Sequence, residues 1–186
     1  MLISSMPCVK FYDSEIWTAF FRILATDPNP ASRRGYSLML GYMPKQFYAP
    51  HEGVIAKDKP ATKIFYLQKV TEALINATKI EDDPEKRDPE TRRNAVHSLI
   101  HLISIVGLNE TWIERELIST VYSAMLQCLN DYSIDNRGDV GSWVREAAIK
   151  AVKKFIDLLL AHDHASGIKN NSANVQLIMP NVHFQI

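Results

Sequence analysis

Apolar residues recur every three or four positions along most of the chain, which is the spacing of one face of an α-helix. No stretch alternates between polar and apolar residues in the way that a half-buried strand does. The pattern therefore predicts an all-α chain. The predicted helices cover residues 13–26, 30–43, 63–77, 88–106, 111–128 and 139–161.

Several of these helices carry recognisable end signals. Asp88 can cap a helix whose first position is Pro89, where a missing N–H costs nothing. Gly107 stands where a helix of this register would end in a glycine-specific conformation. Thr111 and Glu114 have the spacing of a capping box at the start of the next helix.

Three of the predicted helices begin in a similar way. The segments read SRRGYSLMLG from Ser32, TRRNAVHSLI from Thr91 and WVREAAIKAV from Trp143. Arg34, Arg93 and Arg145 occupy matching places, and an aspartate-containing turn precedes each segment. This similarity indicates an internal repeat of helical hairpins.

The pattern of leucine, turn aspartate, arginine and alanine resembles a HEAT repeat. It predicts a HEAT/armadillo-like α-solenoid segment of about three helical hairpins. The arginine spacings are 93 − 34 = 59 and 145 − 93 = 52 residues, longer than the roughly 40–47 of that class. The surplus lies in the extended turns and in a loop from Pro44 to Pro60, where insertion costs little. Three unrelated helix pairs in a bundle remain the alternative.

An acidic turn, NDYSIDNRGD, leads into the last helix. As an EF-hand loop from Asp131 it would place Asn136 where glycine is needed and Ser142 where a bidentate glutamate is needed, which excludes the motif. We interpret the tripeptide Arg137-Gly138-Asp139 as a helix joint and not as an adhesion motif: Gly138 supplies a conformation that other residues resist, and Asp139 caps the helix. The residues to which we assign turn and repeat roles are Asp131, Arg137, Gly138, Asp139, Trp143 and Arg145.

Composition narrows the functional classes. Twenty-one basic residues balance twenty-one acidic ones, so the chain lacks the basic excess of most nucleic-acid-binding domains. No apolar run approaches 18 residues, and the start has no secretory leader, so we expect neither membrane insertion nor secretion but a cytoplasmic protein. Residues 1–12 are expected to be a flexible N-terminus, 13–161 a helical repeat domain and 162–186 a frayed or atypical tail.

Candidate chemistry is sparse. His97 and His101 have the spacing of two metal ligands on one helix, and a metal-dependent hydrolase is the enzymatic alternative. They lack the adjacent glutamate of a zincin and a third ligand, so flanking histidines are favoured. Cys128 falls on an apolar stripe and is expected to be a packed thiol. No phosphate-binding GxxxxGK[ST] motif occurs, and no cofactor is expected.

Three segments together resemble one protein family. Asn130 to Ala148, containing RGDVGSWVRE, looks like a signature of the C-terminal region of the tubulin-folding cofactor D (tubulin-specific chaperone D) family. NPASRRGYSLMLGYMP from Asn29 and DPETRRNAVHSLIHLISIVG from Asp88 are similar to two further segments of that family. The resemblance covers roughly residues 13–161.

The resemblance implies a long HEAT/armadillo solenoid and a role in folding tubulin after the chaperonin. It implies binding of β-tubulin, assembly with cofactors C and E and α-tubulin, a part in stimulating GTP hydrolysis, and association with an Arf-like small GTPase. It further implies a cytoplasmic location, with microtubules or centrosomes as possible sites. A HEAT-repeat scaffold of another pathway, such as transport or phosphatase assembly, is the alternative.

Two arginine pairs are the candidate partner-facing residues: Arg33 with Arg34, and Arg92 with Arg93. At matching repeat positions they would line one edge of the stack and meet an acidic partner. The competing interpretation is an internal ladder of aspartate and arginine with a solvated neighbour.

Overall fold

The computed structural model describes residues 14–48, 66–83, 87–108 and 114–165 of the chain. Its described part contains six α-helices and very little sheet, so the predicted all-α class is confirmed. The helices are α1 (Ser14–Thr26), α2 (Pro30–Gly41), α3 (Tyr66–Ala77), α4 (Pro89–Val106), α5 (Arg115–Gln127) and α6 (Gly141–Ala165).

The short elements all lie in connections. The 3-10 helix η2 (Lys45–Phe47) follows α2, and η4 (Cys128–Asn130) follows α5. Strands β1 (Ile134–Asp135) and β2 (Gly138–Asp139) pair antiparallel in the turn before α6. This hairpin corrects the expectation of no strand: two residues a side are too few to produce an alternating pattern.

The ends of several helices differ from the prediction. Asp88 is the N-cap residue of α4, but its carboxylate does not bond to the helix backbone. Thr111 lies outside the described residues, so the capping box is untested, and Glu114, at the N-cap of α5, forms no side-chain cap bond. Helix α6 continues to Ala165, beyond the predicted end at residue 161. The remainder of the predicted tail and residues 1–12 lie outside the described residues.

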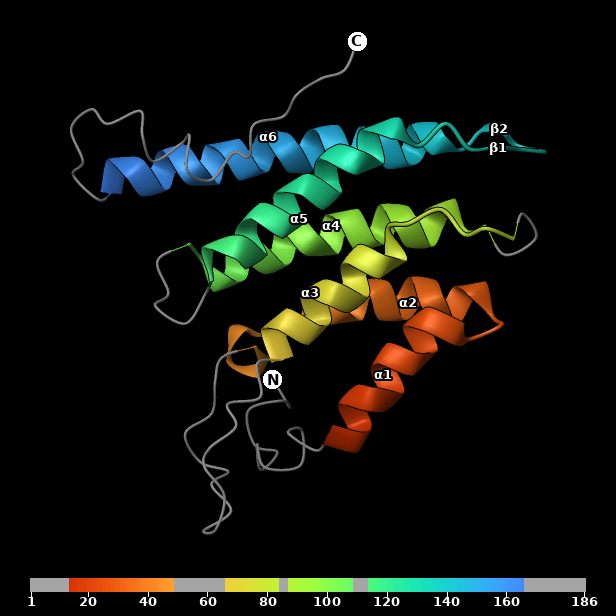
Figure 1. The fold of residues 1–186 in the computed structure, drawn as a ribbon, viewed down its shortest axis with the longest axis horizontal. Helices are drawn as coiled ribbons and strands as arrows, with labels where there is room; N and C mark the ends of the chain where they lie inside the picture. Colours follow the sequence, from red (N-terminus) through yellow and green to blue (C-terminus); the bar gives the residue numbers. More distant parts are fainter. Residues whose placement is uncertain (1–13, 49–65, 84–86, 109–113, 166–186) are drawn as a thin grey trace, which may run out of the picture.

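Successive helices pair, and the pairs lie next to one another. In Figure 1, α2, α4 and α6 run in the same direction one above the other, and α1, α3 and α5 cross in front of them. Helix α4 packs against both α2 and α6, while α3 packs against α1 and α5. The result is two layers of helices, with α4 at the centre of its layer.

The predicted apolar faces form the core between these layers. The apolar residues at helical spacing in the predicted helices 88–106 and 139–161 are all buried: Val140, Val144, Ala147, Ala148, Ala151, Phe155 and Leu159 of the α6 stripe, and Ala95, Val96, Leu99, Ile103 and Val106 of the α4 stripe. Trp17 of α1 stacks on Tyr66 of α3 with ring centroids 4.7 Å apart, and Tyr122 of α5 stacks on Phe155 of α6 at 5.0 Å. Among the described helices, none combines the length and apolar character needed to cross a bilayer.

Helices α2 and α4 approach unusually closely at Gly41. A Cβ atom added there would lie 2.5 Å from the Cα of Ser98, so the contact requires glycine. Small buried polar groups fill the same seam: the Ser98 hydroxyl donates to the Ser37 carbonyl at 2.7 Å, and the Asn94 amide to the Arg34 carbonyl at 3.3 Å. These bonds satisfy side chains that would otherwise be costly to bury.

The start of the predicted long loop after α2 is fixed by Tyr48. This side chain is fully buried, and its hydroxyl donates to the Leu40 carbonyl at 2.6 Å while accepting the Met43 N–H at 3.1 Å. Burial raises the pKa of this phenol, so it remains a neutral donor. The end of α2 is therefore tied to the segment that follows it.

Candidate functional site

The first predicted arginine pair converges on a buried aspartate. Arg34 in α2 donates to Asp88 through Nε at 2.9 Å and approaches it through Nη2 at 2.9 Å. Arg33 donates to the Asp27 carbonyl at 2.8 Å and lies 3.8 Å from Asp88. Thr91 Oγ1 also donates to Asp88, at 2.7 Å. Burial alone would raise the pKa of Asp88, but these hydrogen bonds outweigh it and hold the pKa below its ordinary value.

The second link is more deeply buried. The side chain of Arg92 in α4 is 0% exposed and donates to Asp131 at 2.8 Å, to Glu81 at 3.0 Å and to Ser133 at 3.0 Å. Asp131, itself 3% exposed, also accepts bonds from the backbone and hydroxyl of Ser133 at 3.0 and 2.6 Å. Its pKa is lowered because the bonds from Ser133 and Arg92 overcome the effect of burial. All three guanidinium nitrogens of Arg92 and both carboxylate oxygens of Asp131 have a partner, as buried charges require.

Both links connect one helix pair to the next. Asp88 belongs to the turn between α3 and α4, and its arginines come from α2; Asp131 belongs to the turn between α5 and α6, and its arginine comes from α4. Arg93, which aligns with Arg34 by sequence, takes no part in a link. The ladder interpretation thus describes Arg92, whose buried side chain is not available to a partner in this structure.

The two links predict acid sensitivity. A carboxylate whose pKa is lower in the folded than in the unfolded chain adds stability that is fully present above its ordinary pKa and lost as the pH falls below about 4. We therefore expect the unfolding free energy to decrease from pH 6 to pH 3, and to decrease less in Asp131→Asn than in the parent chain. Urea unfolding at both values measures this. The same pH dependence in Asp131→Asn and in the parent chain would refute the assignment.

The acidic turn is held by its own ion pairs. Arg137 contacts Asp135 at 2.7 Å and Glu90 of α4 at 2.6 Å, and its guanidinium lies 5.0 Å from the ring centroid of Trp143. Asp139 contacts Arg145 at 2.6 Å and accepts the Ser142 N–H at 3.0 Å.

Both charged residues of the Arg137-Gly138-Asp139 tripeptide are therefore engaged within the chain. Arg145 also donates to the backbone carbonyl of Asp131, within its own turn. In the described part of the chain, no cluster of three or more His, Cys, Asp or Glu side chains fits a metal ion. These contacts support a structural role for the turn.

Gly138 provides a test of the turn. Its φ of 100° is one that side chains resist, although an added Cβ would meet nothing within 4 Å. We expect Gly138→Val to lower the unfolding free energy by about 1–3 kcal/mol through backbone strain alone. Thermal and urea unfolding measure it. Gly35→Val is the matched control, since that site is equally open but lacks a positive φ. Equal stability of the two variants would contradict the strain argument.

A polar groove of about 330 Å³ lies between α4 and α6. Arg93 and His97 line it from α4, and Trp143, Glu146 and Lys150 from α6. Lys150 pairs with Glu146 at 2.6 Å, while Arg93 has only a 3.4 Å contact to the side chain of its neighbour Asn94. Of the four candidate arginines, Arg93 is thus the one that combines a groove position with a weakly engaged guanidinium.

The histidines of the enzymatic alternative lie on the same helix but in separate surroundings. Burial first, and then the charges of Arg93 and Lys150, lower the pKa of His97, so it is neutral at pH 7. His101 packs on the ring of Tyr42 with centroids 3.8 Å apart, and burial lowers its pKa too. Cys128 is buried as expected, and burial raises its thiol pKa to about 11. None of these groups is arranged as a nucleophile with its base.

Comparison with known proteins finds relatives that are named for tubulin. The chain is 29% identical to tubulin-specific chaperone D of Dictyostelium discoideum, over 90% of its own length but 12% of that protein. It is 25% identical to tubulin-folding cofactor D of Schizosaccharomyces pombe, over 55% of its length and 8% of that protein. The resemblance found in the sequence is confirmed, as similarity to a small part of these longer proteins. No family model matches the chain, and no solved structure matches it.

Proposed function

We propose, on the premise of this similarity, that the chain acts as a segment of a tubulin-folding chaperone. In this role it binds β-tubulin, assists its folding after release from the chaperonin, and supports assembly of the α/β-tubulin heterodimer. The observation that carries the proposal is the similarity over 90% of the chain to a protein named for tubulin. In this role the chain acts by binding its partners through its surface and not by catalysing a covalent reaction.

We further propose that residues 13–161 form a HEAT-like repeat segment. Support comes from the antiparallel helix pairs and from the two links that join each pair to the next through an arginine and a turn aspartate. In such a stack, one layer of helices presents a continuous surface to partners. Here the α2, α4 and α6 layer would do so.

The α4–α6 groove is the proposed contact for tubulin. Its lining combines the cations of Arg93 and Lys150, the latter paired with Glu146, with the aromatic ring of Trp143. A carboxylate on the partner would pair with Arg93 while an apolar side chain packs on Trp143. Aromatic and arginine side chains of this kind contribute most of the energy in many protein interfaces.

Co-precipitation of β-tubulin by the 186-residue chain tests the proposal. We expect the chain to retain β-tubulin and the double variant Arg93→Glu, Lys150→Glu to retain about tenfold less, because two attractive contacts become repulsive. The matched control is Lys69→Glu, Lys79→Glu, which makes the same charge change at two exposed positions away from the groove. It should retain tubulin as the parent does.

Failure of the parent chain to retain β-tubulin would contradict the binding role. Equal losses in both double variants would contradict the groove while leaving the role intact, since net charge would then explain the effect.

The same resemblance extends the proposal to a larger assembly. It adds cofactors C and E with α-tubulin, an Arf-like small GTPase, and a contribution to GTPase activation within the complex. A cytoplasmic location, with association to microtubules or centrosomes, is part of this proposal. Adding these proteins one at a time to the co-precipitation shows which of them binds this segment.

A further inference from the structure

A second groove lies on the other layer, between α3 and α5, and has the opposite charge. Its volume is about 270 Å³. Glu72 of α3 and Glu114 and Glu116 of α5 contribute carboxylates to its lining, and no basic residue lines it. Within the described residues, none of the three carboxylates forms an ion pair. The groove therefore carries three carboxylates and no basic side chain in its lining.

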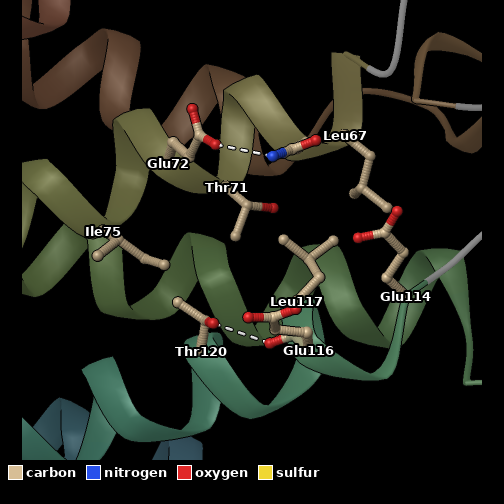
Figure 2. Close-up of a pocket in the computed structure, with 9 residues that line it drawn as sticks. Leu67, Thr71, Glu72, Ile75, Glu114, Glu116, Leu117 and Thr120 are labelled. Carbon is tan, nitrogen blue, oxygen red and sulfur yellow. Dashed lines mark hydrogen bonds between the residues drawn. The ribbon is translucent and has the colours of Figure 1, made fainter. Parts of the chain in front are cut away.

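The floor of the groove contains an unsatisfied polar group. Thr71 is 0% exposed, and its Oγ1 has no hydrogen-bond partner in the described structure. Figure 2 shows this hydroxyl pointing away from α3 into the space between the two helices. A threonine in a helix can usually bond to a carbonyl one turn earlier, and leaving a buried hydroxyl unpaired is costly. Such a group indicates a site that a ligand completes.

The rest of the lining is partly apolar, with the polar side chains of Gln68 and Thr120 also present, and the groove is small. The apolar side chains in the lining, next to the carboxylates, are those of Leu67, Ile75 and Leu117. Its volume is below the roughly 300–1,000 Å³ of typical small-molecule sites, and so fits a single side chain better than a compact metabolite. A long side chain with an aliphatic stem and a cationic end matches both parts of the lining.

We propose that the α3–α5 groove binds a lysine or arginine side chain of a partner polypeptide. The stem packs on Leu67 and Leu117, the cation lies among the three glutamates, and its N–H donates to Thr71 Oγ1 when the neighbouring side chains move aside. This site is separate from the α4–α6 groove and has the opposite preference. The chain would thus contact acidic and basic segments of partners through different layers.

Nuclear magnetic resonance titration of the ¹⁵N-labelled 186-residue chain tests the proposal. The probe is an acetylated and amidated peptide, Ala-Leu-Arg-Leu-Ala, and its control is the same peptide with neutral citrulline in place of arginine. We expect saturable shifts of the amides around Thr71 and Leu117 with the arginine peptide, at least about fivefold weaker with citrulline. The variant Glu72→Gln, Glu114→Gln, Glu116→Gln should weaken binding by a similar factor. Glu146→Gln in the other groove should not.

The variant Thr71→Val distinguishes a role of Thr71 in binding from a purely structural role. Valine fills the same space without the unpaired hydroxyl, so we expect a higher melting temperature together with weaker peptide binding. Unchanged binding in Thr71→Val and in the triple glutamine variant would overturn the proposal. Equal binding of the citrulline peptide would also overturn it, as would amide shifts confined to residues outside the groove. Two further results would identify another occupant: amide shifts that depend on protein concentration alone would indicate a second copy of the chain, and a groove already filled by another part of the same chain would leave no room for a partner.

Discussion

Replacing Arg92 with methionine is expected to lower the free energy of unfolding by about 3–5 kcal/mol. Methionine keeps the apolar stem but removes the guanidinium and its charge, and Asp131 is then a buried carboxylate without its cation. Glu81 and Ser133 lose a hydrogen-bond donor at the same time. Urea unfolding followed by circular dichroism measures the change.

Two further variants sharpen this prediction. Lys150→Met breaks an ion pair whose two side chains are 67% and 66% exposed, and such a pair contributes only about 0.3–0.5 kcal/mol. Arg92→Lys keeps the charge but loses the fork of donors that reaches three acceptors, so its loss should be intermediate. If Arg92→Met were no more harmful than Lys150→Met, the buried link would have no structural importance.

Replacing Gly41 with alanine is expected to lower the unfolding free energy by about 1–3 kcal/mol, although alanine normally favours a helix. The added methyl would overlap Ser98, and forcing atoms into a packed contact costs about this much or more. Gly35→Ala, in the same helix but with open space around it, is the matched control. It should stabilise the chain by up to about 1 kcal/mol.

The double variant Gly41→Ala, Ser98→Gly tests the geometry of this crossing. Removing the serine side chain should restore only part of the loss, because the Cα of Ser98 itself would be 2.5 Å from the new methyl group. Opposite signs for Gly41→Ala and Gly35→Ala are the result that we predict. A gain in both would mean that α2 and α4 are farther apart than the structure has them.

The helices and their buried faces were predictable because helical periodicity is local. The stripe from Val140 to Leu159 needs no knowledge of its neighbours, and all of it is buried. The same holds for Gly138, whose positive φ follows from its place in a tight turn. Cys128, on an apolar stripe, was likewise identified as a packed thiol.

The register of the links was not predictable by the same route. Matching the letters aligned Arg34 with Arg93, but Arg92 makes the buried contact to Asp131. Adjacent residues point about 100° apart around a helix, and which of two arginines faces the next pair depends on how the helix is rotated in the stack. The Arg92-Arg93 doublet in the sequence indicated where the link would be. Which of the two arginines forms it is determined by helix packing.

Features that join distant segments were missed for a related reason. Local sequence marks Gly41 only as a weak helix former, because the reason for glycine at this position is Ser98 in another helix. Thr71 and the glutamates of the α3–α5 groove come from two helices separated in sequence, and no local pattern brings them together. Glu114 was considered only as a capping residue.

The central claim is that consecutive helix pairs are joined by an arginine of one pair and a buried turn aspartate of the next. A double-mutant cycle on Arg92→Met and Asp131→Asn tests it most directly, because it isolates the energy of that one contact from the other effects of each substitution. We predict a favourable coupling of about 1–3 kcal/mol, with the double variant more stable than the sum of the single losses implies. A coupling of zero within error would contradict the claim.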